Sequence, residues 1–196
     1  MLDSSGRNLV QPLIEKLAKV FILLGFSANM MTIFSFIVGL TSVVFIFLNQ
    51  SIIAVILLWI SGLMDALDGT IARIKKEQSS LGTLMDICSD RAVEQGVIIA
   101  LAVLEPGSRL ALIMLNSSIV LCITIFLVVG TLSEIKSEKS FYYQSGLTER
   151  TETFIFLSLM IMFRDALNTI AVIFTALVIV TAFQRYIEAL KILRKS

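Results

Sequence analysis

Residues 64–91 read MDALDGTIARIKKEQSSLGTLMDICSDR, and this stretch decides how the chain must fold. It joins two apolar segments, yet it carries four aspartates, Asp65, Asp68, Asp86 and Asp90. A carboxylate is costly at membrane depth, so acids among apolar segments indicate a functional site. The spacing places the first two on one face of a helix and the last two on one face of the next helix. We therefore expect two neighbouring helices whose carboxylates converge.

The rest of the chain has the composition of an integral membrane protein. Of its 196 residues, 57% are hydrophobic and 16% are charged, and its mean hydropathy is +0.91. Soluble domains carry about 25% charged residues. Several apolar runs reach the roughly 20 residues that a helix needs to cross a bilayer. The sequence predicts an all-α membrane protein with six spans, at about 30–48, 51–73, 82–104, 108–132, 152–164 and 167–190.

A further helix is predicted before the first span. Apolar residues recur at helical spacing through residues 5–25, and Glu15, Lys16 and Lys19 fall largely off that stripe. Such an amphipathic helix lies along a membrane surface, and packing against the transmembrane helices is an equal alternative. The prediction therefore divides the chain into a juxtamembrane helix, residues 1–27, and a six-helix transmembrane domain with the aspartates, residues 28–196.

Basic residues mark one side of the membrane. Arg109 and Arg164 lie in turns on one side, and Arg91 lies within a span, whereas all other Lys and Arg residues fall on the opposite side. Cytoplasmic loops are enriched in Lys and Arg, so both termini and the loop between the aspartate-bearing helices are predicted to be cytoplasmic. The residues on the predicted cytoplasmic side are Arg7, Lys16, Lys19, Arg73, Lys75, Lys76, Lys136, Lys139, Arg150, Arg185, Lys191, Arg194 and Lys195.

The four aspartates indicate a metal site. Carboxylates held close together cannot all stay ionised without cations. The chain contains no histidine, which leaves oxygen ligands and hard cations such as Mg²⁺ or Mn²⁺. Two such ions suit a phosphoryl transfer, because they neutralise the attacking and leaving oxygens. The alternative is that the acids are solvated, or are paired with Arg73 and Arg91.

Two glycines and an arginine strengthen the metal hypothesis. Gly69 and Gly82 each cost helix stability, by about 1 kcal/mol relative to alanine. They fit positions where another backbone or a flat ligand approaches closely. Arg73 offers a rigid fork of N–H donors that suits phosphate oxygens. The stretch therefore predicts a phosphate-bearing ligand beside the metal.

Written as a pattern, the stretch is D-x-x-D-G-x-x-A-R, eight residues, then G-x-x-x-D-x-x-x-D. It resembles the signature of the CDP-alcohol phosphotransferase family, whose members join a CDP-linked lipid or alcohol to a hydroxyl acceptor and release CMP. The resemblance implies a membrane phospholipid-synthesis enzyme that uses two divalent ions and a CDP-linked lipid donor. It also implies a small polar alcohol acceptor and a homodimer, with no nucleic acid as a partner.

The same resemblance implies roles for individual residues. The ligands of the two ions would be Asp65, Asp68, Asp86 and Asp90. Asp90 would also act as the base for the acceptor hydroxyl. The residues that shape the CDP pocket would be Asp68, Gly69, Ala72, Arg73 and Gly82, with Arg73 on the diphosphate.

The start of the first span also resembles the family. FSANMMT, residues 26–32, is similar to the frequent P-N-x-x-T segment, although Ala28 replaces the proline. The resemblance implies that Asn29 and Thr32 contact the nucleotide. A helix cap explains this polar start equally well.

The acceptor is predicted from basic residues. An Asp90-Arg91 pair and a later G-x-x-E-R segment with Arg150 resemble the branch of the family that uses inositol phosphate. Lys136 and Lys139 are further candidates, because basic groups suit an anionic acceptor. The alternatives are that Arg91 pairs with Asp90 or Glu94, and that the other three only mark the cytoplasmic side. Glycerol phosphate or another alcohol is an alternative acceptor.

Two hypotheses of another kind follow from the same acids. A cation transporter uses acids within the membrane, but it predicts acids along the full depth and an internal repeat. A magnesium-dependent intramembrane prenyltransferase also binds a diphosphate, but its aspartate-rich segments usually lie far apart in a longer chain. Here all four acids fall in one short stretch.

Overall fold

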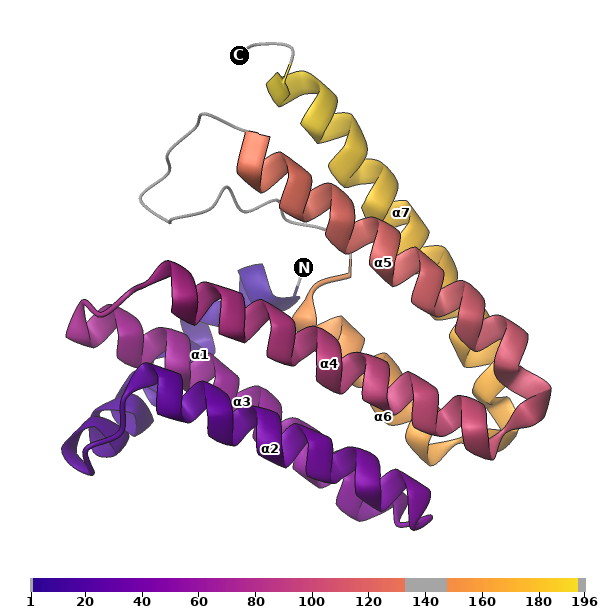
Figure 1. Cartoon of the computed structure of the whole chain (residues 1–196), viewed down its shortest axis with the longest axis horizontal. Helices are drawn as coiled ribbons and strands as arrows, with labels where there is room; N and C mark the ends of the chain where they lie inside the picture. The colour runs from indigo at the N-terminus through magenta and orange to yellow at the C-terminus, as the bar shows by residue number, and fades with distance from the viewer. Residues whose placement is uncertain (1, 133–147, 194–196) are drawn as a thin grey trace. The chain divides into compact units, whose positions relative to one another are not determined.

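The computed structural model describes residues 2–132 and 148–193, and these residues are almost entirely helical (Figure 1). The described part contains no strand. Two short 3-10 turns, Pro106–Ser108 and Arg164–Ala166, precede the fifth and seventh α-helices. The α-helices are α1 (Leu2–Leu23), α2 (Ala28–Phe47), α3 (Ser51–Lys75), α4 (Ser80–Leu104), α5 (Arg109–Leu132), α6 (Arg150–Met162) and α7 (Leu167–Leu193). The predicted all-α class is confirmed.

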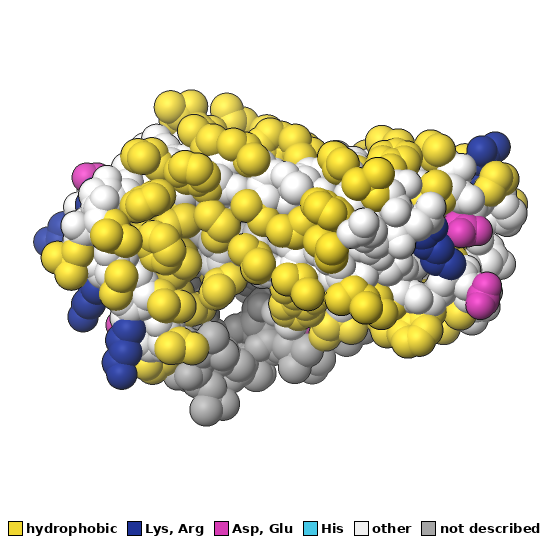
Figure 2. Space-filling view, turned by 90° about the horizontal axis from the view of Figure 1, so that it is seen from below, with side chains coloured by type: hydrophobic (Ala, Val, Ile, Leu, Met, Phe, Trp, Pro, Cys, Tyr) yellow, Lys and Arg dark blue, Asp and Glu magenta, His cyan; other side chains and the backbone are white. Residues whose placement is uncertain are grey.

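Four of the predicted spans are long and apolar enough to cross a membrane: Ala28–Phe47, Ser51–Lys75, Pro106–Leu132 and Arg164–Leu193. The protein is therefore an integral membrane protein, and hydrophobic side chains cover much of the surface in Figure 2. The predicted count of six also needs α4 and α6. Helix α4 has 25 residues but carries several charged side chains, and α6 has 13 residues, about 20 Å of helix. Their spanning stays a prediction.

The chain forms two compact units, the N-terminal unit, Gly6–Leu104, and the C-terminal unit, made of Met1–Ser5 and Glu105–Ser196. In the N-terminal unit, α2 packs along both α3 and α4. Ser35 of α2 and Ser61 of α3 are both buried, and each hydroxyl donates to the other residue's carbonyl oxygen at 2.9 Å. Paired small residues allow this close approach of two apolar helices.

A glycine on α2 brings α4 equally close. A Cβ atom added to Gly39 would lie 2.5 Å from Cγ2 of Val93, which is shorter than real contacts of this kind. One turn further along α2, Val43 lies against Gly96 in the same way, with 3.0 Å between Cγ2 and an added Cβ. Helix α2 therefore fixes the positions of α3 and α4, and so of the aspartates that they carry.

Helix α1 packs against the bundle with one face and leaves a second apolar face exposed. Ala18 is fully buried in a cluster with Met31 of α2 and with Leu67 and Ile71 of α3. This contact is the alternative that the sequence left open. Leu13, Val20 and Leu24 are exposed and recur at helical spacing, so a membrane-surface role stays a prediction as well.

In the C-terminal unit, α5 and α7 lie side by side and α6 packs on α7. The rings of Phe156 and Phe174 stack with centroids 4.8 Å apart. The buried hydroxyl of Thr181 on α7 accepts from the backbone N–H of Thr148 at 3.0 Å, which ties the start of α6 to α7. Glu149 then caps α6 in a capping box with Glu152.

Candidate metal centre

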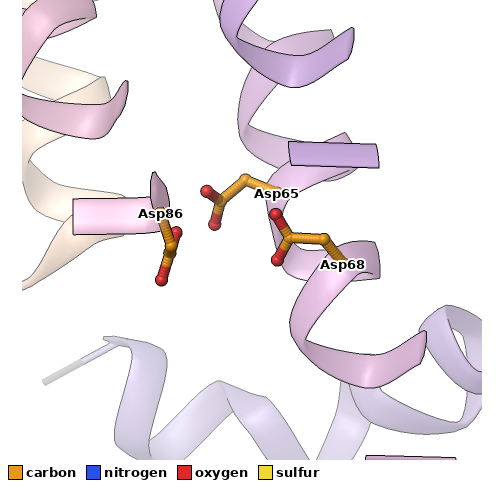
Figure 3. Close-up of side chains that lie close together, drawn as sticks. All are labelled: Asp65, Asp68 and Asp86. Carbon is orange, nitrogen blue, oxygen red and sulfur yellow. The ribbon is translucent and has the colours of Figure 1, made fainter. Parts of the chain in front are cut away.

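Three of the four predicted aspartates meet in the N-terminal unit. Asp65 and Asp68 extend from α3 and Asp86 extends from α4, and Figure 3 shows their carboxylates turned toward one another. One oxygen from each lies within 4.8 Å of the others. Asp65 is 7% exposed and Asp68 is 6% exposed, whereas Asp86 is partly buried. The predicted convergence of two helices is confirmed for these three residues.

This arrangement fits a divalent cation. Three carboxylates at such distances repel one another, and burial of two of them strengthens the repulsion by lowering the local dielectric constant. Their oxygens are the ligands that Mg²⁺ and Mn²⁺ prefer, and no soft ligand belongs to the group. The donor set therefore suits divalent metal binding.

The N-terminal turn of α2 borders the carboxylates. Thr32 is buried, and its hydroxyl lies 2.6 Å from Oδ2 of Asp68, to which it can donate. The side-chain oxygen of Asn29 lies beside Gly82 at the start of α4, 3.3 Å from the position of an added Cβ. The cap of α2 is Ser27, whose hydroxyl accepts from the N–H of Met30. Asn29 and Thr32 are therefore not the capping residues, and both lie near predicted site residues.

Gly69 and Arg73 lie on a neighbouring part of α3. The nearest atom to an added Cβ on Gly69 is Nη1 of Arg73 at 3.6 Å, so the glycine leaves room beside the guanidinium. Arg73 donates to the hydroxyl of Thr70 at 2.8 Å and is exposed. Ala72, between them and partly buried, adds no bulk beyond a methyl group. The predicted pocket residues thus follow the aspartates toward the end of α3.

The fourth aspartate lies further along α4. Asp90 follows Asp86 by one helical turn, about 6 Å along the axis, and is outside the three-carboxylate group. Its neighbour Arg91 forms an ion pair with Glu94, through Nη1 and Oε2. This pairing was one of the two interpretations of Arg91. It leaves a role for Arg91 in acceptor binding as a prediction.

The remaining acceptor candidates belong to the C-terminal unit or lie outside the described residues. Arg150 is the first residue of α6, and its guanidinium carbon lies 5.7 Å from the ring centroid of Phe154. Lys136 and Lys139 lie outside the described residues.

Sequence reasoning used one further arginine only to orient the chain. Arg185 of α7 lies with its guanidinium carbon 5.1 Å from the ring centroid of Phe126, and it donates to Sγ of Cys122 at 3.5 Å. Its position near the cytoplasmic end of the predicted span 167–190 was the signal, because a cation within a span is a functional candidate.

A model of the CDP-alcohol phosphatidyltransferase family matches residues 26–184, a range that includes Asp65, Asp68 and Asp86. The chain belongs to this family. The resemblance carried by the aspartate pattern is thereby confirmed. The protein is a membrane enzyme of phospholipid biosynthesis that transfers substituted phosphate groups.

Two relatives match this CDP-alcohol phosphatidyltransferase over different lengths. The inner membrane protein YnjF of Escherichia coli (strain K12) is 30% identical over 196 residues, covering 94% of this chain and 93% of YnjF. Archaetidylinositol phosphate synthase of Pyrococcus horikoshii is 31% identical over 102 residues, covering 52% of this chain and 54% of that protein.

The fold of the family member is shared with a solved enzyme. Phosphatidylinositol phosphate synthase of Mycobacterium tuberculosis with CDP-DAG bound has a TM-score of 0.74 at 16% identity, covering 91% of this chain and 94% of that chain. The same enzyme in complex with manganese and citrate has a TM-score of 0.73, covering 90% of this chain and 88% of that chain. At 16% identity, this structural similarity establishes a shared fold and nothing further.

Proposed function

We propose that this family member transfers a phosphatidyl group from a CDP-linked lipid, such as CDP-diacylglycerol, to the hydroxyl of a small polar acceptor and releases CMP. The observation that carries the proposal is the group formed by Asp65, Asp68 and Asp86 on two helices. Three converging carboxylates, two of them buried, have little use except to hold cations, and a diphosphate is the ligand that needs them. The M. tuberculosis enzyme of the same fold binds CDP-DAG, which supports the donor class.

In this proposal the four aspartates, Asp90 included, hold two ions, Mg²⁺ or Mn²⁺. The manganese in the related enzyme supports the class of metal. When bound, the ions would supply neutralisation of the negative charge on the diphosphate oxygens. Thr32 keeps the carboxylate of Asp68 oriented by its hydrogen bond.

The nucleotide is proposed to lie along the ends of α2, α3 and α4. Residues without bulky side chains leave room for it, and Arg73 offers donors to the diphosphate. Asn29 lies beside Gly82 at the same end of the unit, which supports a contact with the nucleotide. The proposed nucleotide-binding residues are Asn29, Thr32, Asp68, Gly69, Ala72, Arg73 and Gly82.

The proposed reaction is a direct displacement. The acceptor hydroxyl oxygen attacks the phosphorus that carries the lipid alcohol, and the bond from that phosphorus to the oxygen of CMP breaks. Asp90 takes the hydroxyl proton, because a carboxylate one turn from the group of Asp65, Asp68 and Asp86 is placed to act as a base. CMP leaves with the electron pair of the broken bond, and the phosphatidylated acceptor is the second product.

Inositol phosphate is the proposed acceptor, and glycerol phosphate or another alcohol is the alternative. The match to archaetidylinositol phosphate synthase supports the first, because the product in that protein's name is a lipid that carries inositol phosphate. Guanidinium and ammonium groups bind phosphate well, so we assign this role to Arg91, Arg150, Lys136 and Lys139. Family membership argues against the transporter and prenyltransferase hypotheses.

The membrane arrangement completes the proposal. We propose that α4 and α6 cross the bilayer with the four candidate spans, that residues 1–27 form the surface helix, and that residues 28–196 form the catalytic domain. Both termini and the aspartates would face the cytoplasm, where nucleotides and Mg²⁺ are found. A homodimer is the proposed assembly.

The decisive experiment measures CMP release by the purified protein with CDP-diacylglycerol and Mg²⁺. Inositol phosphate, glycerol phosphate, inositol, serine and water are supplied in separate reactions, each with and without EDTA. Release that depends on inositol phosphate and stops with EDTA is expected. Release with glycerol phosphate alone would replace the acceptor, and no release with any acceptor would contradict the proposed donor.

A further inference from the structure

Glu94 is a buried acid that the proposed reaction does not use. It lies one turn beyond Asp90 on α4 and is 4% exposed, so its carboxylate is removed from water. A buried carboxylate is stable when a cation and hydrogen bonds compensate the lost hydration. Arg91, three residues earlier on the same helix, provides such a partner through Nη1.

The helix under Glu94 is held firmly in place. Val93, the residue before Glu94, packs closely against Gly39 of α2. Gly96, two residues after Glu94, packs closely against Val43 of α2. The two contacts bring α4 and α2 close together on both sides of Glu94. Glu94 is therefore a fixed anchor for whatever its carboxylate binds.

Arg91 is the more exposed partner of the two. Its side chain is 36% exposed, whereas that of Glu94 is 5% exposed, so the guanidinium reaches from the buried acid toward the surface. Guanidinium carries five N–H donors in a planar fork, and the bond to Glu94 is through Nη1. The other N–H donors of the guanidinium are suited to bind an oxyanion. Arg91 also directly follows Asp90, the proposed base.

We propose that Glu94 is a positioning residue, which holds the guanidinium of Arg91 where it binds the phosphate of an anionic acceptor. This inference rests on the proposed function. A phosphate at Arg91 could belong to the acceptor or to the CDP-linked donor, so the test must separate the two. The charge of Glu94 and its orienting effect on Arg91 should also change phosphate binding in opposite directions. A second negative charge near the site weakens phosphate binding, whereas a held guanidinium strengthens it.

The substitution Glu94→Asp separates these effects, because it keeps the charge and shortens the side chain by one methylene group. We expect it to raise the KM for inositol phosphate by about five- to tenfold, because the misplaced guanidinium of Arg91 loses a well-aligned charge-assisted hydrogen bond to the acceptor phosphate. The kcat and the KM for CDP-diacylglycerol should stay within about twofold. In an Arg91→Gln background, the same substitution should change the acceptor KM by less than about 1.5-fold, because its partner is gone.

Two results overturn the inference while the proposed function stands. One is an unchanged acceptor KM in Glu94→Asp with normal CMP release. The other is an effect of equal size in the Arg91→Gln background. A rise in the donor KM in place of the acceptor KM would overturn it too, and would assign the guanidinium to the diphosphate. Activity with an uncharged acceptor only would overturn the inference and replace inositol phosphate as the acceptor, while phosphatidyl transfer would stand. No activity at all in the parent protein would contradict the proposed donor and the inference together.

A second ion pair serves as the control. Glu105 and Arg164 of the C-terminal unit lie 3.9 Å apart, and Glu105→Asp shortens an acid by the same methylene group. Its acceptor KM should equal that of the parent protein.

If Glu94→Asp unfolds in detergent, Glu94→Gln replaces it in the comparison. This substitution removes the negative charge, so simple charge predicts a lower acceptor KM, whereas loss of orientation predicts a higher one. The inference requires the higher acceptor KM for Glu94→Gln alone. It also requires no further change when Glu94→Gln is added to Arg91→Gln. A lower acceptor KM would overturn the inference.

Discussion

The hydroxyl of Thr32 on α2 lies 2.6 Å from a carboxylate oxygen of Asp68 on α3, with both side chains buried. The contact joins residues 36 positions apart and reaches the three-carboxylate group from a helix that supplies none of its acids. Hydrogen bonds to a ligand's outer edge orient it toward a metal. Helix α2 thus takes part in the site as well as supporting it.

Replacing Thr32 by valine removes this hydrogen bond and keeps the side-chain shape. We expect CMP release to fall by about tenfold to a hundredfold and the Mg²⁺ concentration for half-maximal activity to rise, as for other groups that orient metal ligands. The matched control is Thr41→Val, because Thr41 is on the same helix and its hydroxyl donates within that helix, to the carbonyl of Ile37. Equal metal dependence in the two variants would contradict the orienting role.

Replacing Asp86 by asparagine removes one charge from the proposed ligand set at constant size. We expect turnover to fall by at least about a thousandfold, equivalent to roughly 4 kcal/mol of transition-state stabilisation. The protein should remain folded, since fewer repelling carboxylates relieve the group. Asp165→Asn in the 3-10 turn before α7 is the control. Turnover near the parent level in Asp86→Asn would remove Asp86 from the ligand set.

Gly39 should tolerate no larger residue. An added Cβ at 2.5 Å from Val93 forces a side-chain or helix shift, and overpacking of this kind costs about 1–3 kcal/mol. We therefore expect Gly39→Ala to lower the melting temperature in detergent even though alanine favours a helix. Gly107→Ala, with nothing within 4 Å of its added Cβ, should not lower it. Adding Val93→Ala to Gly39→Ala should restore part of the loss, and no recovery would mean that Val93 is not the cause.

Thr181 should control the start of α6. Its hydroxyl accepts from the N–H of Thr148, so Thr181→Val leaves that amide without its partner at a cost of about 1 kcal/mol. Hydrogen exchange of the amide of Thr148 should then accelerate by about fivefold. Thr175→Val is the control, because the buried hydroxyl of Thr175 donates within α7 to Ala171. The same exchange rate in both variants would show that Thr181 does not hold this segment.

The class of the protein was readable from local sequence. Length and hydropathy of the apolar runs predict α2 to α7, because a backbone in lipid must satisfy its own hydrogen bonds, and the helical spacing of apolar residues predicts α1. The boundaries of α2 and α3 fall within about two residues of the predicted spans. The aspartate pattern predicted the family and three members of the carboxylate group, because spacing along a helix determines which side chains share a face.

Helix partners were not readable in this way. The sequence predicted that the two aspartate-bearing helices would be neighbours, but it did not predict that α2 packs along both of them. Ser35, Ser61 and Gly39 set those contacts, and in the sequence they look like any small residues in an apolar run. The contact of Ala18 with the bundle was likewise only one of two alternatives for α1.

What the sequence by itself determined is the membrane class, the helical segments and the acids of the site, since each depends on residues close together along one helix. Only the tertiary structure decided that Thr32 reaches Asp68, that Asn29 lies beside Gly82, and that Glu94 is buried. These relationships depend on how closely separate helices approach. That distance follows from the fit of side chains along whole helix surfaces, which no local pattern records.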